Sequence, residues 1–207
     1  MPASGGPTRA GARILPIRVL DEHCSGTAFS FAAGIVAAVE GGARIINASL
    51  GALESSLVVQ QAVSYAVRNG VLFVAPTGNV REGERGTEHL AFPARQYPEV
   101  TAVAAVTSGY VAAPWAVLDH RVAFAAPGID LIVAHGGGWA LGQGSSFSAA
   151  LVSGAAAAAL GADPGLTRRT LLKRLEHTAI GVDSYNRQCK GKLGRGVPDV
   201  GRLAGHD

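Results

Sequence analysis

The sequence has few cysteines and few aromatic or charged residues. Two cysteines in 207 residues, Cys24 and Cys189, exclude a small fold stapled by disulfides but leave one bridge, two free thiols or one reactive group open. Aromatic residues make up 6% and charged residues 16% of the chain, which favours small-residue helices on buried strands over an all-β sandwich. With 48% hydrophobic residues, the chain can bury a real core, so it is not disordered.

The sequence lacks the features that membrane, nucleic-acid and metal partners require. The longest apolar stretch, around residues 155–160, is short of the roughly 20 residues that span a bilayer, so we expect no membrane partner. The net charge is only +3 and basic residues form no stripe interleaved with aromatics, so we expect no nucleic-acid partner. Without a carboxylate cluster, we predict neither a metal nor another cofactor. Residues 1–11 lack the pattern of a signal peptide and are expected to be flexible.

Short apolar runs alternate with helical periodicity along the chain. The pattern predicts strands at 14–20, 44–48, 71–75, 100–106, 122–125 and 131–134, and helices at 29–39, 56–68, 146–160 and 167–177. This order is typical of parallel strands joined by helices, and the unbroken apolar run 71–74 is typical of a strand buried on both faces. We therefore expect one α/β domain over residues 1–207, with ligands at the carboxyl ends of the strands, after Ala48 and Ala75.

Four short segments follow predicted strands or begin a predicted helix. They are Asn47-Ala48-Ser49-Leu50-Gly51, Pro76-Thr77-Gly78-Asn79, Ala125-Ala126-Pro127-Gly128 and Gly144-Ser145-Ser146-Phe147-Ser148-Ala149-Ala150. Singly, each is an ordinary turn or capping sequence. In this order and spacing they resemble the motifs Asn-x-Ser-Leu-Gly, Ala-x-Gly-Asn, Ala-Pro-Gly and Gly-Thr-Ser-x-Ala of the subtilisin-like serine proteases, the subtilases of the peptidase S8 family.

The resemblance covers the C-terminal two-thirds of the subtilase catalytic domain. It implies a three-layer α/β subtilisin-like domain with a mostly parallel sheet, from which the N-terminal part of the family fold is missing. It also implies that Ser146, at a helix start, is the nucleophile and that Asn79 is the side-chain donor of the oxyanion hole, with the Ser146 backbone N–H as its companion. By analogy with relatives, the protein is expected to be secreted or periplasmic.

The substrate-binding residues are likewise implied by the resemblance. Ser49, Leu50 and Gly51 correspond to the strand that pairs with an extended peptide or protein substrate, and a glycine there lets another backbone approach. The expected floor of the specificity pocket is formed by Ala75, Thr77 and Gly78. Its side walls are expected to depend on the loop 80–91.

The family's Asp and His are not in this chain, because neither Asp-[Ser/Thr]-Gly nor His-Gly-Thr occurs in it. His23, beside Asp21, and His135 are the alternatives for a base, although Asp21 and His23 lie in one turn and their side chains are expected to diverge. Near the nucleophile, Ala150 stands where the family has proline, and Leu151 where it often has His or Phe. The proline's loss is expected to change how the helix start is held.

Two hypotheses follow from this incomplete triad. In the first, the chain is part of a serine endopeptidase, and the missing Asp and His lie upstream or come from a complementing chain. In the second, it is a non-catalytic pseudoprotease that binds extended peptide or a partner protein at Ser49 to Gly51. A remoter alternative is esterase-like residual activity from Ser146 and the oxyanion hole alone.

Overall fold

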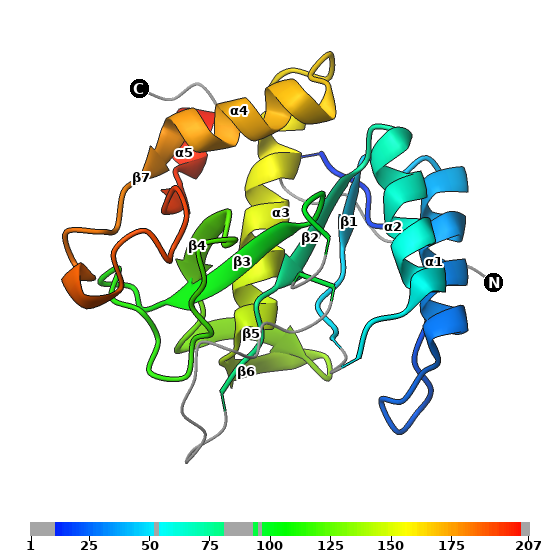
Figure 1. Ribbon diagram of the computed structural model, residues 1–207, viewed down its shortest axis with the longest axis horizontal. Coiled ribbons are helices and arrows are strands. Elements are labelled where there is room, and N and C mark those ends of the chain that lie inside the picture. Colours follow the sequence, from blue (N-terminus) through cyan, green and yellow to red (C-terminus); the bar gives the residue numbers. More distant parts are fainter. Residues whose placement is uncertain (1–10, 52–53, 81–92, 95–96, 204–207) are drawn as a thin grey trace.

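A parallel four-stranded sheet forms the centre of the computed structural model, which describes residues 11–51, 54–80, 93–94 and 97–203. Its strands lie in the order β1 (Ile45–Asn47), β2 (Leu72–Pro76), β3 (Thr101–Val106) and β4 (Phe124–Pro127). The register pairs Asn47 with Val74, and Val106 with Pro127. Their carboxyl ends therefore meet at one edge of the sheet, where the predicted motifs follow them (Figure 1).

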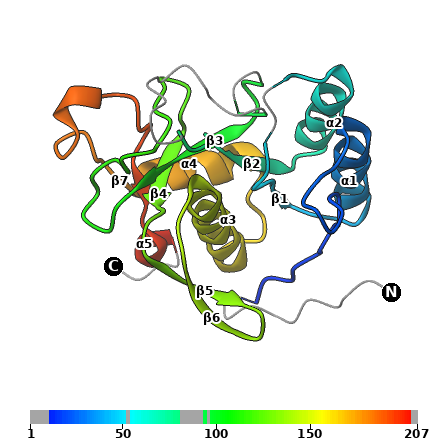
Figure 2. The ribbon, with the colours of Figure 1, turned by 90° about the horizontal axis from the view of Figure 1, so that it is seen from below.

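Helices cover both faces of the sheet and make three layers, as the sequence predicts. Phe73 and Ala75 face helices α1 (Ala28–Glu40) and α2 (Leu57–Arg68), whereas Leu72 and Val74 face α3 (Ser145–Ala162). Because alternate side chains enter two separate cores, the strand has no polar face, which is why the run 71–74 is apolar throughout. Figure 2 shows α1 and α2 together on one side and α3 beneath the sheet.

The four predicted helices are all present, within two residues of the expected ends. The last, α4 (Arg168–Thr178), begins at the predicted N-cap Thr167, whose hydroxyl accepts from the Thr170 backbone N–H in a capping box. Thr27 makes an equivalent capping box with Ser30 at the start of α1. Among the described helices, α3 has the length and hydropathy of a membrane span, yet it packs along the strands of the sheet.

The predicted strand 14–20 is wrong. The segment forms no strand, and its residues make no backbone ladder with any residue that the structure describes. Its side chains nevertheless pack on α1, since a Cβ on Gly34 would overlap Val19 Cγ1 and lie 3.2 Å from Ile17 Cγ2. These contacts with α1 are partial, because Ile14, Leu15 and Ile17 stay exposed. The segment also pairs with no strand that the structure describes.

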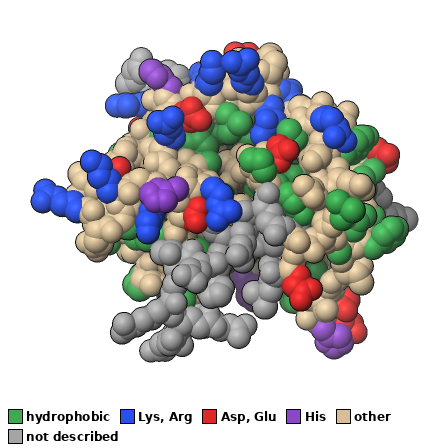
Figure 3. Space-filling model, in the orientation of Figure 1, with side chains coloured by type: hydrophobic (Ala, Val, Ile, Leu, Met, Phe, Trp, Pro, Cys, Tyr) green, Lys and Arg blue, Asp and Glu red, His purple; other side chains and the backbone are tan. Residues whose placement is uncertain are grey.

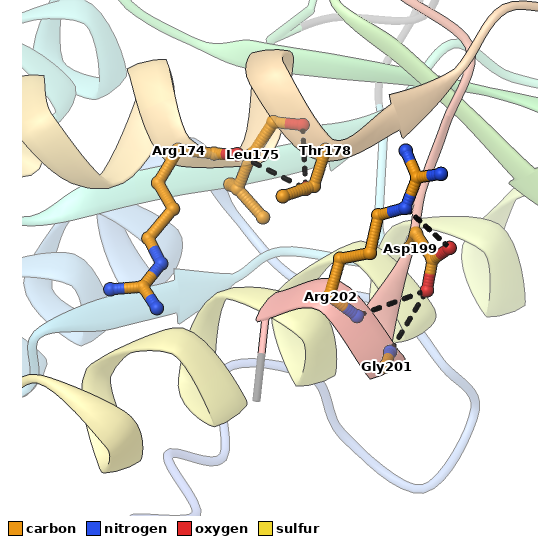
Figure 4. Close-up of polar contacts among 6 residues, drawn as sticks. All are labelled: Arg174, Leu175, Thr178, Asp199, Gly201 and Arg202. Carbon is orange, nitrogen blue, oxygen red and sulfur yellow. Dashed lines mark hydrogen bonds and ion pairs between the residues drawn. The ribbon is translucent and has the colours of Figure 1, made fainter. Parts of the chain in front are cut away.

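Beyond the sheet, the chain adds small elements that the sequence pattern does not predict. The hairpin β5 (Leu131–His135) and β6 (Gly138–Gly142) includes the predicted strand 131–134, and β7 (Ala179–Ile180) pairs with β8 (Val197–Pro198). A 3-10 turn (Arg187–Cys189) lies between β7 and β8. The short α5 (Val200–Leu203) is capped by Asp199, which accepts from the Gly201 and Arg202 backbone N–H groups (Figure 4).

Many basic side chains lie on the surface of α4 (Figure 3). On the face shown in Figure 3, Lys and Arg side chains gather over α4, with acidic side chains between them. Cys24 is exposed, Cys189 is partly buried and both thiols are free, which decides among the alternatives left open for the cysteines. The predicted flexibility of residues 1–11 concerns a segment that, up to residue 10, lies outside the described residues.

Candidate active site

The four predicted motifs converge on the first two turns of α3. The helix begins after Gly144, which has a φ of 141° and offers no side-chain cap. The Ser145 backbone N–H donates to Asn79 instead, whereas the Ser146 backbone N–H donates to no residue that the structure describes. Ser146 is the second residue of the helix and is partly buried. Its hydroxyl makes no hydrogen bond to a residue that the structure describes. A partly buried serine at a helix start, with no described partner for its hydroxyl, suits a nucleophile better than a cap.

The Asn79 side chain is held in one orientation by Ser145. Asn79 Oδ1 accepts from the Ser145 backbone N–H at 3.0 Å and lies 2.8 Å from Ser145 Oγ. Because a backbone N–H can only donate, the amide oxygen must face Ser145 and the Asn79 NH₂ group must point away. Asn79 is exposed, and its NH₂ group is left without a partner among the described residues.

The two expected donors of the oxyanion hole border one small space. A Cβ atom placed on Gly144 would lie 3.5 Å from Asn79 Nδ2 and 3.9 Å from the Ser146 backbone nitrogen. Glycine at this position therefore leaves open a space that two N–H donors flank. Such a pair of donors is suited to an oxygen that acquires negative charge during a reaction.

The Ala-Pro-Gly segment supports the same helix start from the end of β4. The Gly144 backbone N–H donates to the Gly128 carbonyl at 2.8 Å, and Ser148 Oγ donates to the Pro127 carbonyl at 3.1 Å. A Cβ on Gly128 would lie 2.5 Å from Ser148 Oγ and 2.8 Å from Ala105 Cβ. Only glycine fits here, which explains this residue of the motif in physical terms.

A cavity of about 590 Å³ lies between the segment after β1 and the turn before α1. Ser49, Leu50 and Gly51 line one side of it, and the turn 24–28 lines another. The three residues assigned to an extended substrate thus border an open groove. The residues expected to form the floor of the specificity pocket do not line this cavity. Ala75 and Thr77 are fully buried, and of the three only Gly78 reaches the surface. The pocket role of these residues stays a prediction, and loop 80–91 lies outside the described residues beyond Val80.

Neither alternative histidine approaches the nucleophile through a hydrogen bond. Asp21 Oδ1 accepts from the His23 and Ser25 backbone N–H groups, so its carboxylate holds the turn and not the imidazole. His23 Nε2 instead lies 3.8 Å from Glu22 in an exposed ion pair. His135 is exposed on β5. Among the described residues, then, no imidazole is hydrogen-bonded to Ser146, and no group of three acidic, His or Cys side chains could hold a metal.

Sequence reasoning missed several side chains that hold the site together. These are Asn47, Ser145, Ser148 and Ser153, which hydrogen-bond the start of α3 to neighbouring segments or to each other. Three of the four lie inside the quoted motifs, so the sequence indicates where they are. It does not indicate their roles, because serine and asparagine are common in turns and caps, and only the fold brings these residues into contact.

Comparisons with known proteins agree with this geometry. The sequence model of the subtilase family, Peptidase_S8, matches residues 4–201. Subtilisin DY from Bacillus licheniformis is 33% identical over 175 residues, which cover 83% of this chain and 63% of that protein. The thermostable alkaline protease of Halalkalibacterium halodurans is 30% identical over 192 residues, covering 92% of this chain and 50% of that protein. This chain thus spans less than two thirds of either relative.

Solved structures of maturation proteases have the same fold. The prenylagaramide maturation protease PagA superimposes with a TM-score of 0.76 at 26% identity, over 90% of this chain and 69% of that one. The patellamide maturation protease PatA gives a TM-score of 0.76 at 28% identity, over 92% and 74% of the two chains. The expected subtilisin-like α/β fold is therefore confirmed. The chain belongs to the subtilase family of serine proteases.

Proposed function

We propose that this chain is the nucleophile-bearing part of a subtilisin-like serine endopeptidase. It hydrolyses peptide bonds together with a segment, upstream in the same protein or on a complementing chain, that supplies Asp and His. The observation that carries the proposal is the space beside Gly144, which Asn79 Nδ2 and the Ser146 backbone nitrogen flank. A structural cap would need neither the free hydroxyl of Ser146 nor an outward-facing amide on Asn79. Both groups instead suit acyl transfer.

The proposed chemistry begins when Ser146 Oγ bonds to the scissile carbonyl carbon and its proton passes to the imidazole of the complementing chain. The carbonyl oxygen takes up the displaced electron pair and accepts hydrogen bonds from Asn79 Nδ2 and the Ser146 N–H. The C–N bond then breaks, and the imidazolium protonates the leaving amine. Water hydrolyses the resulting ester by the same route, which restores the Ser146 hydroxyl.

The groove at Ser49, Leu50 and Gly51 is proposed to hold the substrate on the acyl side of the scissile bond. An extended peptide can bond to the backbone there, and Gly51 presents no side chain to obstruct it. Ser49 also contacts the nucleophile's residue, because its Oγ donates to the Ser146 carbonyl at 2.8 Å. Substrate and nucleophile would thus be aligned by one segment.

The need for a further segment, upstream or on a complementing chain, follows from what surrounds the site. Among the described residues, no histidine bonds to Ser146, and strand β1 pairs only with β2. Several apolar side chains also stay exposed, among them Ile14 (60%), Leu151 (45%) and Trp139 (78%). A strand and helix that carry the family's Asp and His would cover such a surface and bring a base to Ser146.

A fluorophosphonate probe tests the proposal, because it reacts only with an activated serine. We expect labelling of this chain when it is co-expressed with a chain that carries the family's Asp and His motifs. Ser146→Ala should abolish that labelling, and Asn79→Ala should lower kcat by about 10²–10³, the range known for such a donor in a subtilisin. Correctly folded complex that never labels would overturn the proposal.

A second candidate is a non-catalytic peptide-binding protein, which the unpartnered Ser146 hydroxyl and the open groove would also allow. In that case the chain alone should bind extended peptides, measured by fluorescence anisotropy, and the complementing chain should confer no labelling. Labelling of the isolated chain would instead indicate residual esterase-like chemistry from Ser146 and its donors.

A further inference from the structure

A line of polar side chains joins the end of β1 to two turns of α3. Ser153 Oγ lies 3.1 Å from Asn47 Oδ1, Asn47 Nδ2 lies 2.9 Å from Ser49 Oγ, and Ser49 Oγ lies 2.8 Å from the Ser146 carbonyl oxygen. The line begins and ends on α3, and between these two points it passes through residues at the carboxyl end of β1. Its three side chains, those of Ser153, Asn47 and Ser49, belong neither to the oxyanion hole nor to the expected triad.

The directions of the hydrogen bonds from Asn47 to Ser49 and from Ser49 to Ser146 are fixed by the last acceptor. The Ser146 carbonyl can only accept, so Ser49 donates its single hydroxyl proton there. Ser49 must then accept from Asn47, which turns the Asn47 NH₂ group toward Ser49 and its amide oxygen toward Ser153. The single hydroxyl proton of Ser153 is shared between two acceptors, Asn47 Oδ1 at 3.1 Å and the Ala149 carbonyl at 2.9 Å within its own helix.

The two attachment points on α3 are seven residues apart. Residues 146 and 153 are separated by about two helical turns and therefore lie on the same side of the helix. A link at both positions to the fixed end of β1 opposes rotation and sliding of α3 against the sheet. Asn47 and Ser49 are exposed, so the line contributes little burial, and its effect is on the placement of the helix.

We infer that Ser49 is a positioning residue for Ser146: its hydroxyl, oriented by Asn47 and Ser153, holds the Ser146 carbonyl and so sets where the nucleophile stands. The reactive consequence rests on the proposed function. Misplacement of a reacting group by about 1 Å can reduce a rate by about 10²-fold. All four groups are neutral, so the effect of losing the line should not change with pH between 6 and 9.

Selective isotope labelling tests the inference without any need for activity. The sequence contains two Ser–Phe pairs, Ser30–Phe31 and Ser146–Phe147. With carbonyl-¹³C serine and ¹⁵N phenylalanine, an HNCO spectrum of the full chain reports on the carbonyls of Ser30 and Ser146 alone. Because hydrogen bonding deshields a carbonyl carbon, Ser49→Ala should move the Ser146 resonance upfield and leave that of Ser30 in place.

Matched variants make the result decisive. Ser49→Thr keeps the hydroxyl and should retain the wild-type Ser146 resonance, whereas Ser153→Ala should shift it in part. Ser55→Ala, an exposed serine in the following loop that bonds to nothing described, should leave both resonances unchanged. An unmoved Ser146 resonance in a folded Ser49→Ala protein would overturn the inference.

Kinetics in the presence of the complementing chain test the consequence for reaction. Ser49→Ala keeps the backbone that would pair with substrate, so we expect an unchanged KM and a kcat lower by about 10- to 100-fold, with recovery in Ser49→Thr. If Ser49→Ala shifts the Ser146 resonance but leaves kcat unchanged, the hydrogen bond exists and the positioning role is refuted. A wild-type complex that neither labels nor hydrolyses would refute the proposed function instead, and the spectrum would still decide whether Ser49 holds the carbonyl.

Discussion

Buried polar side chains in this protein differ sharply in how well they are satisfied. Asn186 is 2% exposed and makes three hydrogen bonds, accepting from the Ala112 N–H and donating to the Tyr110 and Val182 carbonyls. Thr77 is 0% exposed, and its Oγ1 has no hydrogen-bond partner among the residues that the structure describes. The first residue fastens a loop to the C-terminal segment, whereas the second carries the cost of a desolvated hydroxyl.

Thr77→Val should therefore stabilise the protein. Valine has nearly the same shape and removes the unpaired hydroxyl, so we expect the free energy of unfolding in urea to rise by about 1–3 kcal/mol. Asn186→Ala is the matched control, because it deletes satisfied hydrogen bonds and should lower the same quantity. A destabilised Thr77→Val variant would mean that the hydroxyl has a partner in solution.

The two cysteines should differ in reactivity. Burial raises the pKa of the Cys189 thiol above its ordinary value, with Asp183 acting in the same direction and Lys192 opposing it. A raised pKa means less thiolate at pH 8, and the thiolate is the reactive form. Iodoacetamide at pH 8 should thus alkylate the exposed Cys24 before Cys189, as mass spectrometry of the native protein would show. Equal rates would contradict this expectation.

At the scale of elements, the start of α3 depends on close contact with the end of β4. Gly128→Ala would place a methyl group 2.5 Å from Ser148 Oγ and 2.8 Å from Ala105 Cβ, so we expect a loss of about 1–3 kcal/mol in unfolding free energy. Gly154→Ala, within α3 itself, meets nothing within 4 Å and should add about 0.5–1 kcal/mol. Thermal denaturation of both variants compares them directly, and equal effects would refute the steric account.

The elements that could be predicted from the sequence depend on local interactions, whereas the others depend on contacts between distant segments. Helical periodicity and the capping residue Thr167 predict the helices well, because both signals are local. The segment 14–20 has the apolar pattern of a strand, but a strand also needs a partner for its backbone, and the pattern carries no information about one. At the site, Ser146 and Asn79 were identified through motif order, while the orienting bonds from Ser145 and Ser153 depend on contacts between distant segments.

The molecule as a whole has one protected and one open sheet edge. Strand β4 is covered by the C-terminal segment, since the Ala125 N–H donates to the Gly196 carbonyl and the Arg195 N–H to the Ala123 carbonyl. Among the described residues, β1 has no such cover on its outer side. The unpaired edge therefore lies on β1, whose chain leads directly to Ser49 and its bond to the Ser146 carbonyl.

The isolated chain should consequently be prone to association. We expect it to bind the dye ANS and to show concentration-dependent self-association in analytical ultracentrifugation, because exposed apolar side chains and an unpaired edge lie on one molecule. Addition of the complementing chain should suppress both effects. A monodisperse monomer that binds no ANS would show that these surfaces need no partner.

The bond between Ser145 and Asn79 also bears on how the site tolerates mutation. One of the two donors to Asn79 Oδ1 is the backbone N–H of residue 145, which every amino acid except proline possesses. The direction in which the Asn79 amide points is therefore encoded by the path of the chain as well as by a side chain. A substitution at position 145 that removes the hydroxyl still leaves the backbone N–H to orient the Asn79 amide. The orientation of Asn79 therefore tolerates changes in the side chain at position 145.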